Sequence, residues 1–183
     1  GLNPVPVWAV VTPHSVDEVV DALRRSDGPV SIGGGRYSMG GQVASPMSLH
    51  LDMRQMNQVL AFSPSDKTIR VQAGARWRDI QRFIDPHGLA VKIMQSYANF
   101  TVGGALSVNC HGRYMGLGPV ILSVRNIRLV LADATVETLE LREPDGAFRR
   151  LEGWLRERGF FAPGGEGLAA DLYLGYGLSQ ALR

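Results

Sequence analysis

The chain has 183 residues, of which 45% are hydrophobic and 20% are charged, and its formal net charge is +2. These ordinary values allow one domain, or two small lobes, with a real core, and give no electrostatic argument for nucleic acid or a membrane surface as a partner. The single cysteine, Cys110, excludes a framework of intrachain disulfides, and no apolar run reaches the roughly 18 residues of a membrane span. A lone cysteine fits a reducing compartment, so we expect a cytoplasmic protein.

The N-terminal part of the chain predicts a β-α-β unit. Residues 5–11 are typical of a strand. Ser15 is placed to cap a helix, with Glu18 three residues later as in a capping box, and the helix should end near Gly28. Residues 30–32 supply the next strand. At this spacing we expect the two strands to be parallel.

The middle of the chain predicts further strands and a short helix. Alternating polarity indicates a half-buried strand at residues 48–53. Trp77, Ile80 and Ile84 recur on one side of a helix over residues 77–84. The remaining expected elements are strands at residues 68–73 and 89–94, a hairpin of residues 123–132 and 135–141 around Asp133, and a helix over residues 149–158.

A glycine-rich loop, residues 33–42 (GGGRYSMGGQ), follows the strand at residues 30–32. Glycines let the backbone approach a ligand closely, and successive amides turned the same way form an anion-binding concavity. The loop has neither the Gly-Lys-Ser/Thr of a Walker A motif nor the Gly-x-Gly-x-x-Gly of a dinucleotide fingerprint. By itself it could be a surface turn, but its place after a strand of the β-α-β unit favours a phosphate ligand.

A second glycine-rich segment covers residues 95–112. Ser96, Thr101, Ser107 and Asn109 offer donors and acceptors to a polar ligand. Alone, this segment could be a tightly packed helix start. Two such segments, in parts of the chain with different strand patterns, favour a ligand held between them.

Several ordered segments together resemble a known family. They are residues 32–41, Ala73-Gly74-Ala75 followed by Trp77-Arg78-Asp79, and residues 101–104 running into His111-Gly112. This combination is similar to the FAD-binding domain of the vanillyl-alcohol oxidase and para-cresol methylhydroxylase (PCMH) flavoproteins. The nearest branch is that of FAD-linked oxidases similar to aldonolactone oxidoreductases and decaprenylphosphoryl-ribose oxidase, and the resemblance extends over residues 7–139.

The resemblance implies a two-lobed α+β fold of the PCMH type that binds FAD. A small N-terminal βαβ lobe would cover residues 1–62, and a larger lobe with a mainly antiparallel sheet would cover residues 63–142. We expect residues 143–183 to be an atypical C-terminal segment, and the cap domain that binds substrate in the family to be absent. We therefore expect a truncated family member, or one whose cap is a separate domain or chain.

The resemblance also assigns cofactor-binding residues by position. The first group would embrace the pyrophosphate: Gly33, Gly34, Gly35, Arg36, Tyr37, Ser38, Met39, Gly40, Gly41 and Gln42. The second group would line the diphosphate and the flavin ring: Ser96, Thr101, Val102, Gly103, Gly104, Ser107, Val108, Asn109, Cys110 and His111. Arg36 would pair with phosphate or with solvent.

Two positions bear on the chemistry. Many relatives bond a histidine covalently to the flavin just before the serine at position 38, but this chain has Tyr37, so we expect non-covalent FAD. His111 is a candidate for tuning the flavin or polarising substrate, with a purely structural role as the alternative. We expect it to point away from Cys110 on an extended segment, so the two should not form a nucleophile and base pair. The other histidines lack metal-ligand spacing, and we expect no metal.

The expected function is that of an FAD-dependent oxidoreductase domain. By resemblance, it would oxidise a CH–OH group of a small alcohol, sugar or lactone by hydride transfer to the flavin. The alternative is a truncated or remnant flavin-binding module without catalysis of its own. Neither hypothesis includes nucleic acid or a membrane span.

Overall fold

The computed structural model describes residues 4–41, 43–112 and 115–140. Their contacts divide them into two compact units. The first unit holds the described residues up to Val91, together with Tyr97–Gly104 and Val130–Glu137, and the second holds Lys92–Ser96, Ala105–Leu129 and the described residues from Thr138. Residues on both sides of the expected boundary at residue 62 lie in the first unit. The helix expected at residues 149–158 lies outside the described residues.

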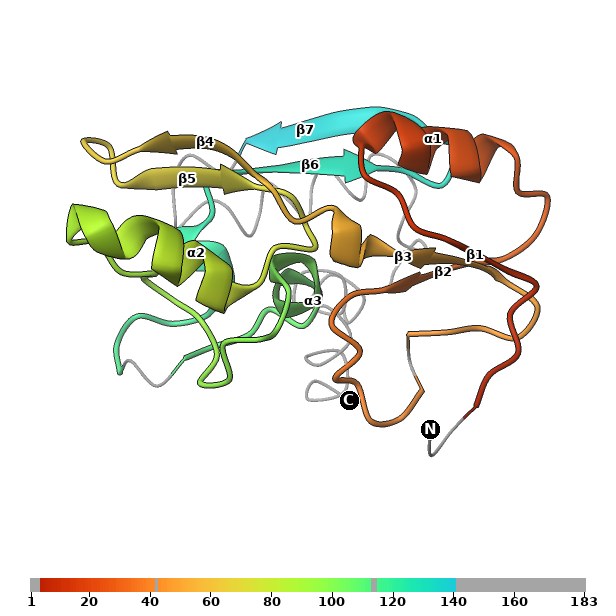
Figure 1. The fold of residues 1–183 in the computed structure, drawn as a ribbon, viewed down its shortest axis with the longest axis horizontal. Helices are drawn as coiled ribbons and strands as arrows, with labels where there is room; N and C mark the ends of the chain where they lie inside the picture. The colour runs from red at the N-terminus through yellow and green to blue at the C-terminus, as the bar shows by residue number, and fades with distance from the viewer. Residues whose placement is uncertain (1–3, 42, 113–114, 141–183) are drawn as a thin grey trace, which may run out of the picture. The chain divides into compact units, whose positions relative to one another are not determined.

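A three-stranded parallel sheet lies in the first unit (Figure 1). It contains β1 (Ala9–Val11), β2 (Val30–Gly33) and β3 (Leu49–Asp52), in the order β1-β3-β2. The predicted parallel direction is confirmed, with Val10 and Ser31 both opposite His50. However, β3 lies between the two strands of the β-α-β unit. The strand expected at residues 48–53 is confirmed over Leu49–Asp52, but the expectation that it is half-buried is wrong, because β3 is the central strand and all four of its residues are buried.

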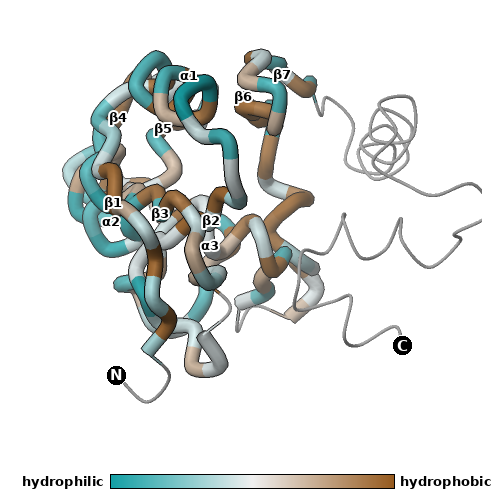
Figure 2. Tube along the Cα trace, turned by 90° about the vertical axis from the view of Figure 1, so that its right-hand side faces the viewer, coloured by the Kyte–Doolittle hydropathy of each residue, from teal (hydrophilic) through white to brown (hydrophobic). Residues whose placement is uncertain are grey.

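Helix α1 (Val16–Arg24) packs its apolar side on this sheet. The predicted cap is confirmed, since Ser15 Oγ accepts a hydrogen bond from the Glu18 amide at 3.2 Å. Figure 2 shows hydrophilic and hydrophobic residues mixed along α1, as in a helix with one face in a core. That core contains Val19, Ala22, Leu49, Leu51 and Met56.

The first unit also contains an antiparallel pair of strands, β4 (Val59–Ser63) and β5 (Thr68–Val71). The sequence predicted β5 but not β4. Helix α2 (Trp77–Ile84) has the predicted bounds and buries the three predicted residues. It contacts the strand pair through Phe83, whose ring lies edge-on to Phe62 with centroids 5.4 Å apart.

The strand expected at residues 89–94 is wrong. These residues have no regular structure, because they have no strand partner among the described residues. Apolar residues occur here because the segment packs into a core and not because it forms a strand, and Ile93 is only 1% exposed. The remaining elements are β6 (Asn126–Val130), β7 (Val136–Glu140), α3 (Val102–Ser107) and the 3₁₀ turns Met53–Gln55, Asp85–His87 and Val120–Ser123.

Strands β6 and β7 form the predicted hairpin around Asp133. The carboxylate of Asp133 accepts hydrogen bonds from the amide and the hydroxyl of Thr135, at 2.9 and 2.6 Å. The Thr135 hydroxyl lowers the pKa of Asp133. No helix among the described residues is long and apolar enough to span a bilayer.

Candidate functional site

The glycine loop continues directly from β2. Gly33 ends the strand, and residues 34–41 form turns and bends with neither helix nor strand. Among the described residues, the amides of residues 35–38 donate to no backbone carbonyl. Arg36 has a φ of 61° and Gly41 a φ of 79°, so the backbone twice enters the left-handed region. Exposed amides in such turns form a concavity that suits an anion.

Residues 101–104 lie against this loop. A Cβ on Gly34 would stand 2.5 Å from Oγ1 of Thr101, which is 4% exposed, so a larger residue requires a shift of the chain. The amides of Val102 and Gly103 donate to the carbonyls of Ala75 and Ala73, at 2.8 and 2.7 Å. The first glycine segment therefore meets residues 101–104 within the first compact unit.

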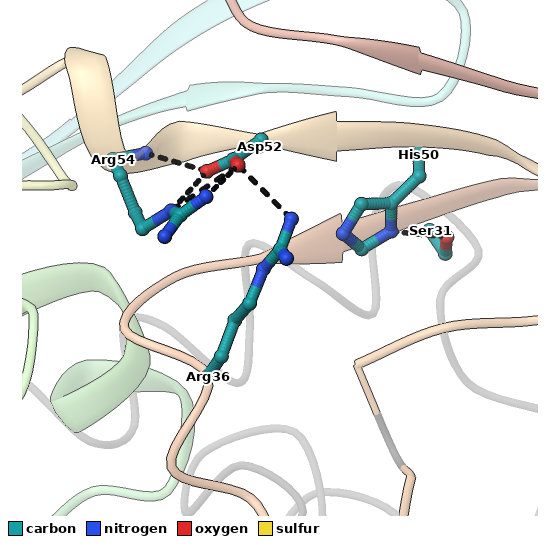
Figure 3. Close-up of polar contacts among 5 residues, drawn as sticks. All are labelled: Ser31, Arg36, His50, Asp52 and Arg54. Carbon is teal, nitrogen blue, oxygen red and sulfur yellow. Dashed lines mark hydrogen bonds and ion pairs between the residues drawn. The ribbon is translucent and has the colours of Figure 1, made fainter. Parts of the chain in front are cut away.

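The side chain of Arg36 turns back toward the sheet. Its Nη2 donates to Oδ2 of Asp52 at 3.0 Å, and Nε of Arg54 donates to Oδ1 of Asp52 at 2.8 Å (Figure 3). The Asp52 side chain is only 7% exposed. Hydrogen bonding from Arg54, joined by the charges of both arginines, lowers the pKa of Asp52 to about 2. This carboxylate ties the glycine loop to the end of β3.

A buried chain of hydroxyls leads to His50 beside this ion pair. Ser48 Oγ donates to the Ser45 carbonyl at 2.7 Å, so its oxygen can only accept from Ser31, at 2.7 Å. With its single proton used, Ser31 must accept from Nδ1 of His50, at 2.8 Å. Burial, followed by the charge of Arg36, lowers the pKa of His50. The neutral ring therefore carries its lone pair on Nε2, and the Arg36 guanidinium lies on that side (Figure 3).

Tyr37 lies among aromatic side chains. Its ring is 5.2 Å from those of Tyr97 and Phe100, centroid to centroid, both in edge-to-face geometry. Residues 36–40 are all exposed, and Met39 is 89% exposed. Gln42 lies outside the described residues.

Six other predicted residues lie in the second unit: Ser96, Ser107, Val108, Asn109, Cys110 and His111. Asn109 is 2% exposed; its Oδ1 accepts from the Ile121 amide at 3.3 Å, and its Nδ2 has no partner among the described residues. Burial raises the pKa of Cys110 to about 11, which makes the thiol a poor nucleophile. His111 is exposed while Cys110 is buried, as expected for opposite sides of an extended segment.

Sequence reasoning missed the polar groups behind the loop. The alternating pattern of residues 48–53 predicts a strand that contains His50 and Asp52, and it predicts no role for either of them or for Arg54. A carboxylate at the end of a buried strand, with an arginine two residues later, is the signal that could have indicated an ion pair. The hydroxyl chain carries no such signal, since it joins residues of different strands.

The sequence profile of the family described as "FAD binding domain" matches residues 7–140. This range contains the glycine loop, residues 101–104 and the ion pair that joins the loop to β3. The chain belongs to this FAD-binding domain family. The resemblance to FAD-linked oxidases seen in the sequence is thereby confirmed.

Relatives of this FAD-binding domain are named as oxidases of sugars and their derivatives. It is 29% identical to L-gulonolactone oxidase of Mus musculus, over 80% of this chain and 33% of that protein. It is 28% identical to alditol oxidase of a Streptomyces species, over 67% of this chain and 30% of that protein. It is 27% identical to decaprenylphosphoryl-beta-D-ribose oxidase of Mycolicibacterium smegmatis, over 79% of this chain and 33% of that protein.

The chain spans about a third of the length of these relatives. Among solved structures, 6-hydroxy-D-nicotine oxidase from Arthrobacter nicotinovorans superposes with a TM-score of 0.66 at 17% identity. That match covers 77% of this chain and 32% of the oxidase. It supports an α+β fold of the PCMH type.

The residues of this FAD-binding domain fit its cofactor. The diphosphate of FAD requires hydrogen-bond donors and close backbone approach. Residues 35–38 supply amides without carbonyl partners among the described residues, and Gly34 permits the tight contact with Thr101. Residues 33–41 of the loop carry no charged side chain apart from Arg36, and Arg36 is already paired with Asp52. Hydrogen bonds from amides, more than side-chain charge, would therefore hold the anion.

Proposed function

We propose that the chain is the cofactor-binding domain of an FAD-dependent oxidoreductase that oxidises a CH–OH group of a small alcohol, sugar or lactone. The main observation is the packing of the glycine loop on residues 101–104 in one compact unit, within a domain of the FAD-binding family. The names of the relatives support the substrate class, because they include aldonolactone and alditol oxidases. FAD, when bound, supplies the acceptor for the hydride that leaves the carbon.

The role of this chain's residues is to bind and orient the cofactor. The amides of residues 35–38 would donate to the diphosphate oxygens. Gly103 lies so close to Ala73 that a Cβ would be 3.0 Å from the alanine Cβ, so a larger residue there would shift residues 101–104 away from Ala73. The predicted residues of the second unit would line the flavin ring, with His111 as the candidate for tuning it.

The catalytic proposal is tested by anaerobic reduction. The purified chain, loaded with FAD, is mixed with an alditol, an aldonolactone or no addition, and the flavin absorbance is followed. Bleaching by one of the substrates, beyond the control, supports the oxidoreductase. A flavin-loaded protein that no substrate bleaches favours the second proposal, a flavin-binding module without catalysis of its own. A chain that takes up no FAD contradicts both.

The second proposal is a flavin-binding module that oxidises no substrate by itself, and the family match to an FAD-binding domain supports the flavin binding. The matched residues correspond to the cofactor-binding domain, and the chain spans about a third of its relatives. A substrate-binding cap would then be contributed by another domain or chain. Adding such a partner should restore bleaching without changing the affinity for FAD.

We also propose that the protein is cytoplasmic, because its single cysteine fits a reducing compartment.

We further propose that FAD is bound without a covalent bond. Tyr37 stands where many relatives carry the linking histidine, and its ring contacts Tyr97 and Phe100. Its pKa is raised, first by the hydrogen bond with the Tyr97 hydroxyl, so the phenol stays protonated and poorly nucleophilic. Acid precipitation of the loaded protein should leave flavin in the supernatant. Flavin that stays in the pellet would show a covalent link.

A further inference from the structure

Two tyrosine side chains lie together beside the glycine loop. Tyr37 belongs to the loop, whereas Tyr97 belongs to the second glycine-rich segment, and neither the sequence nor the family match assigns it a role. Their rings and that of Phe100 form a cluster in which all three centroid distances are between 5.2 and 5.3 Å. A Cβ on Gly35 would be 2.9 Å from the Tyr37 ring, so the cluster rests directly on the loop backbone. Tyr37 is 44% exposed and Tyr97 is 49% exposed, which leaves both accessible.

Two residues determine which way the Tyr97 hydroxyl points. Nη1 of Arg78 donates to Oδ1 of Asn99 at 3.1 Å. A guanidinium can only donate, so the amide oxygen of Asn99 must face Arg78 and its NH₂ group must face the other way. That NH₂ group donates to the hydroxyl oxygen of Tyr97 at 3.0 Å. The Tyr97 oxygen is therefore an acceptor toward Asn99, and its proton points elsewhere.

The Tyr97 hydroxyl keeps its proton for a ligand. Its oxygen accepts from Asn99, so the O–H has to point away from that amide. The donation from Asn99, which Arg78 polarises, also makes the Tyr97 hydroxyl a stronger donor. The direction of the pKa agrees, because hydrogen bonding with Asn99 is the first cause that lowers the pKa of Tyr97. The O–H of Tyr97 is therefore oriented to be donated outward.

We propose that Tyr97, oriented by Asn99 and Arg78, donates a hydrogen bond to a diphosphate oxygen of FAD held at the glycine loop. The proposal rests on the proposed function and adds a contact to it. The loop amides, the phenol donor and the cationic Arg78 all suit an anionic oxygen. Arg78 and Asn99 act as positioning residues, since they act through Tyr97.

The first experiment compares Tyr97→Phe with the wild-type chain in titrations with FAD, ADP and riboflavin. The substitution keeps the half-exposed ring and removes only the hydroxyl, so the fold should be preserved, which circular dichroism checks. We expect about a tenfold loss of affinity for FAD, as for one hydrogen bond to a charged group. ADP should lose affinity in parallel, and riboflavin, which has no phosphate, should lose none. Unchanged FAD affinity, or a loss confined to riboflavin, would overturn the proposal.

The second experiment tests the orientation with Asn99→Asp. The carboxylate can pair with Arg78 but can only accept, so the Tyr97 hydroxyl must donate into it and is no longer available to FAD. The added charge also repels phosphate, and a double-mutant cycle with Tyr97→Phe separates the two effects. Charge repulsion by the carboxylate of Asn99→Asp weakens FAD binding whether residue 97 is Tyr or Phe. The loss that comes from reorienting the Tyr97 hydroxyl occurs only when residue 97 is Tyr. We expect Asn99→Asp to cost several-fold more in the tyrosine background. Equal costs would overturn the positioning role.

A third readout needs no cofactor. The absorbance of ionised tyrosine, followed against pH in the wild type and in Tyr97→Phe, isolates the titration of Tyr97 by difference. Asn99→Asp should shift this titration to higher pH, because a donor to the phenolate is replaced by an anion. An unshifted titration contradicts the hydrogen-bond arrangement. If the wild type binds FAD but the variants bind it equally well, this inference alone fails; if the wild type binds no FAD, the proposed function fails with it.

Discussion

Gly34 is the residue at which the glycine loop packs against Thr101 of the second glycine-rich segment. Gly34→Ala places a methyl group 2.5 Å from the Thr101 hydroxyl. Thr101 is β-branched and only 4% exposed, so its side chain has few other rotamers in which to avoid the clash. We expect the free energy of unfolding in urea to fall by about 1–3 kcal/mol and FAD affinity to fall with it.

Gly28→Ala is the matched control for this change. Nothing lies within 4 Å of a Cβ at Gly28, so the same substitution should alter the free energy of unfolding by less than about 1 kcal/mol. Combining Gly34→Ala with Thr101→Ala should recover part of the lost stability. A Gly34→Ala variant as stable as Gly28→Ala would show that the loop does not pack on Thr101.

The lowered pKa of Asp52 predicts how the free energy of unfolding depends on pH. Its pKa is about 2 in the folded protein, below its usual 3.8, so it stabilises the fold at higher pH and this contribution is lost as pH falls from 3.8 toward 2. The size is about 2 kcal/mol. Asp52→Asn should remove this acid-dependent part and destabilise the fold at neutral pH. The measurement is urea unfolding at a series of pH values.

His50 contributes in a separate pH window. Its folded pKa is lowered by burial, below its usual 6.5, so its contribution is present above 6.5 and is lost as pH falls below that value. Asp52→Asn should leave that loss in place. An unaltered profile below pH 3.8 in Asp52→Asn would contradict the ion-pair geometry.

Backbone contacts between elements depend on Gly74, which follows β5. A Cβ there would be 1.9 Å from the carbonyl oxygen of Met53 and 2.8 Å from that of Met56. The Gly74 amide donates to the same Met56 carbonyl at 2.7 Å. Backbone atoms cannot rotate away as a side chain does, so Gly74→Ala should cost at least about 3 kcal/mol in urea unfolding. A cost no larger than that of Gly28→Ala would contradict this packing.

The secondary structure was predictable where its cause is local. The Ser15 cap and the spacing of Trp77, Ile80 and Ile84 lie within one or two helical turns, and α1 and α2 form as predicted. Strand β4 and the absent strand at residues 89–94 depend on whether a partner strand is available. Pairing between distant segments leaves no such local pattern.

Cofactor binding should stabilise the whole molecule. A ligand that binds only the folded state stabilises it, by about 2.7 kcal/mol at a ligand concentration a hundred times the Kd. FAD should therefore raise the midpoint of thermal unfolding, and Gly34→Ala should show a smaller rise at the same FAD concentration. An unchanged midpoint in saturating FAD would argue against cofactor binding by this chain.

The sequence by itself determined the chemistry of the loop and the family. The glycine content of the loop, the order of the motifs and the match over residues 7–140 can all be read along the chain without knowing which segments meet in space. Only the tertiary structure decided what lies around the loop. β3 enters between β1 and β2 and brings His50 and Asp52 behind it, while Tyr97 and Asn99 reach Tyr37 from a distant segment. Proton and charge arrangements of this kind depend on atoms that folding brings together, and no pattern along the chain specifies them.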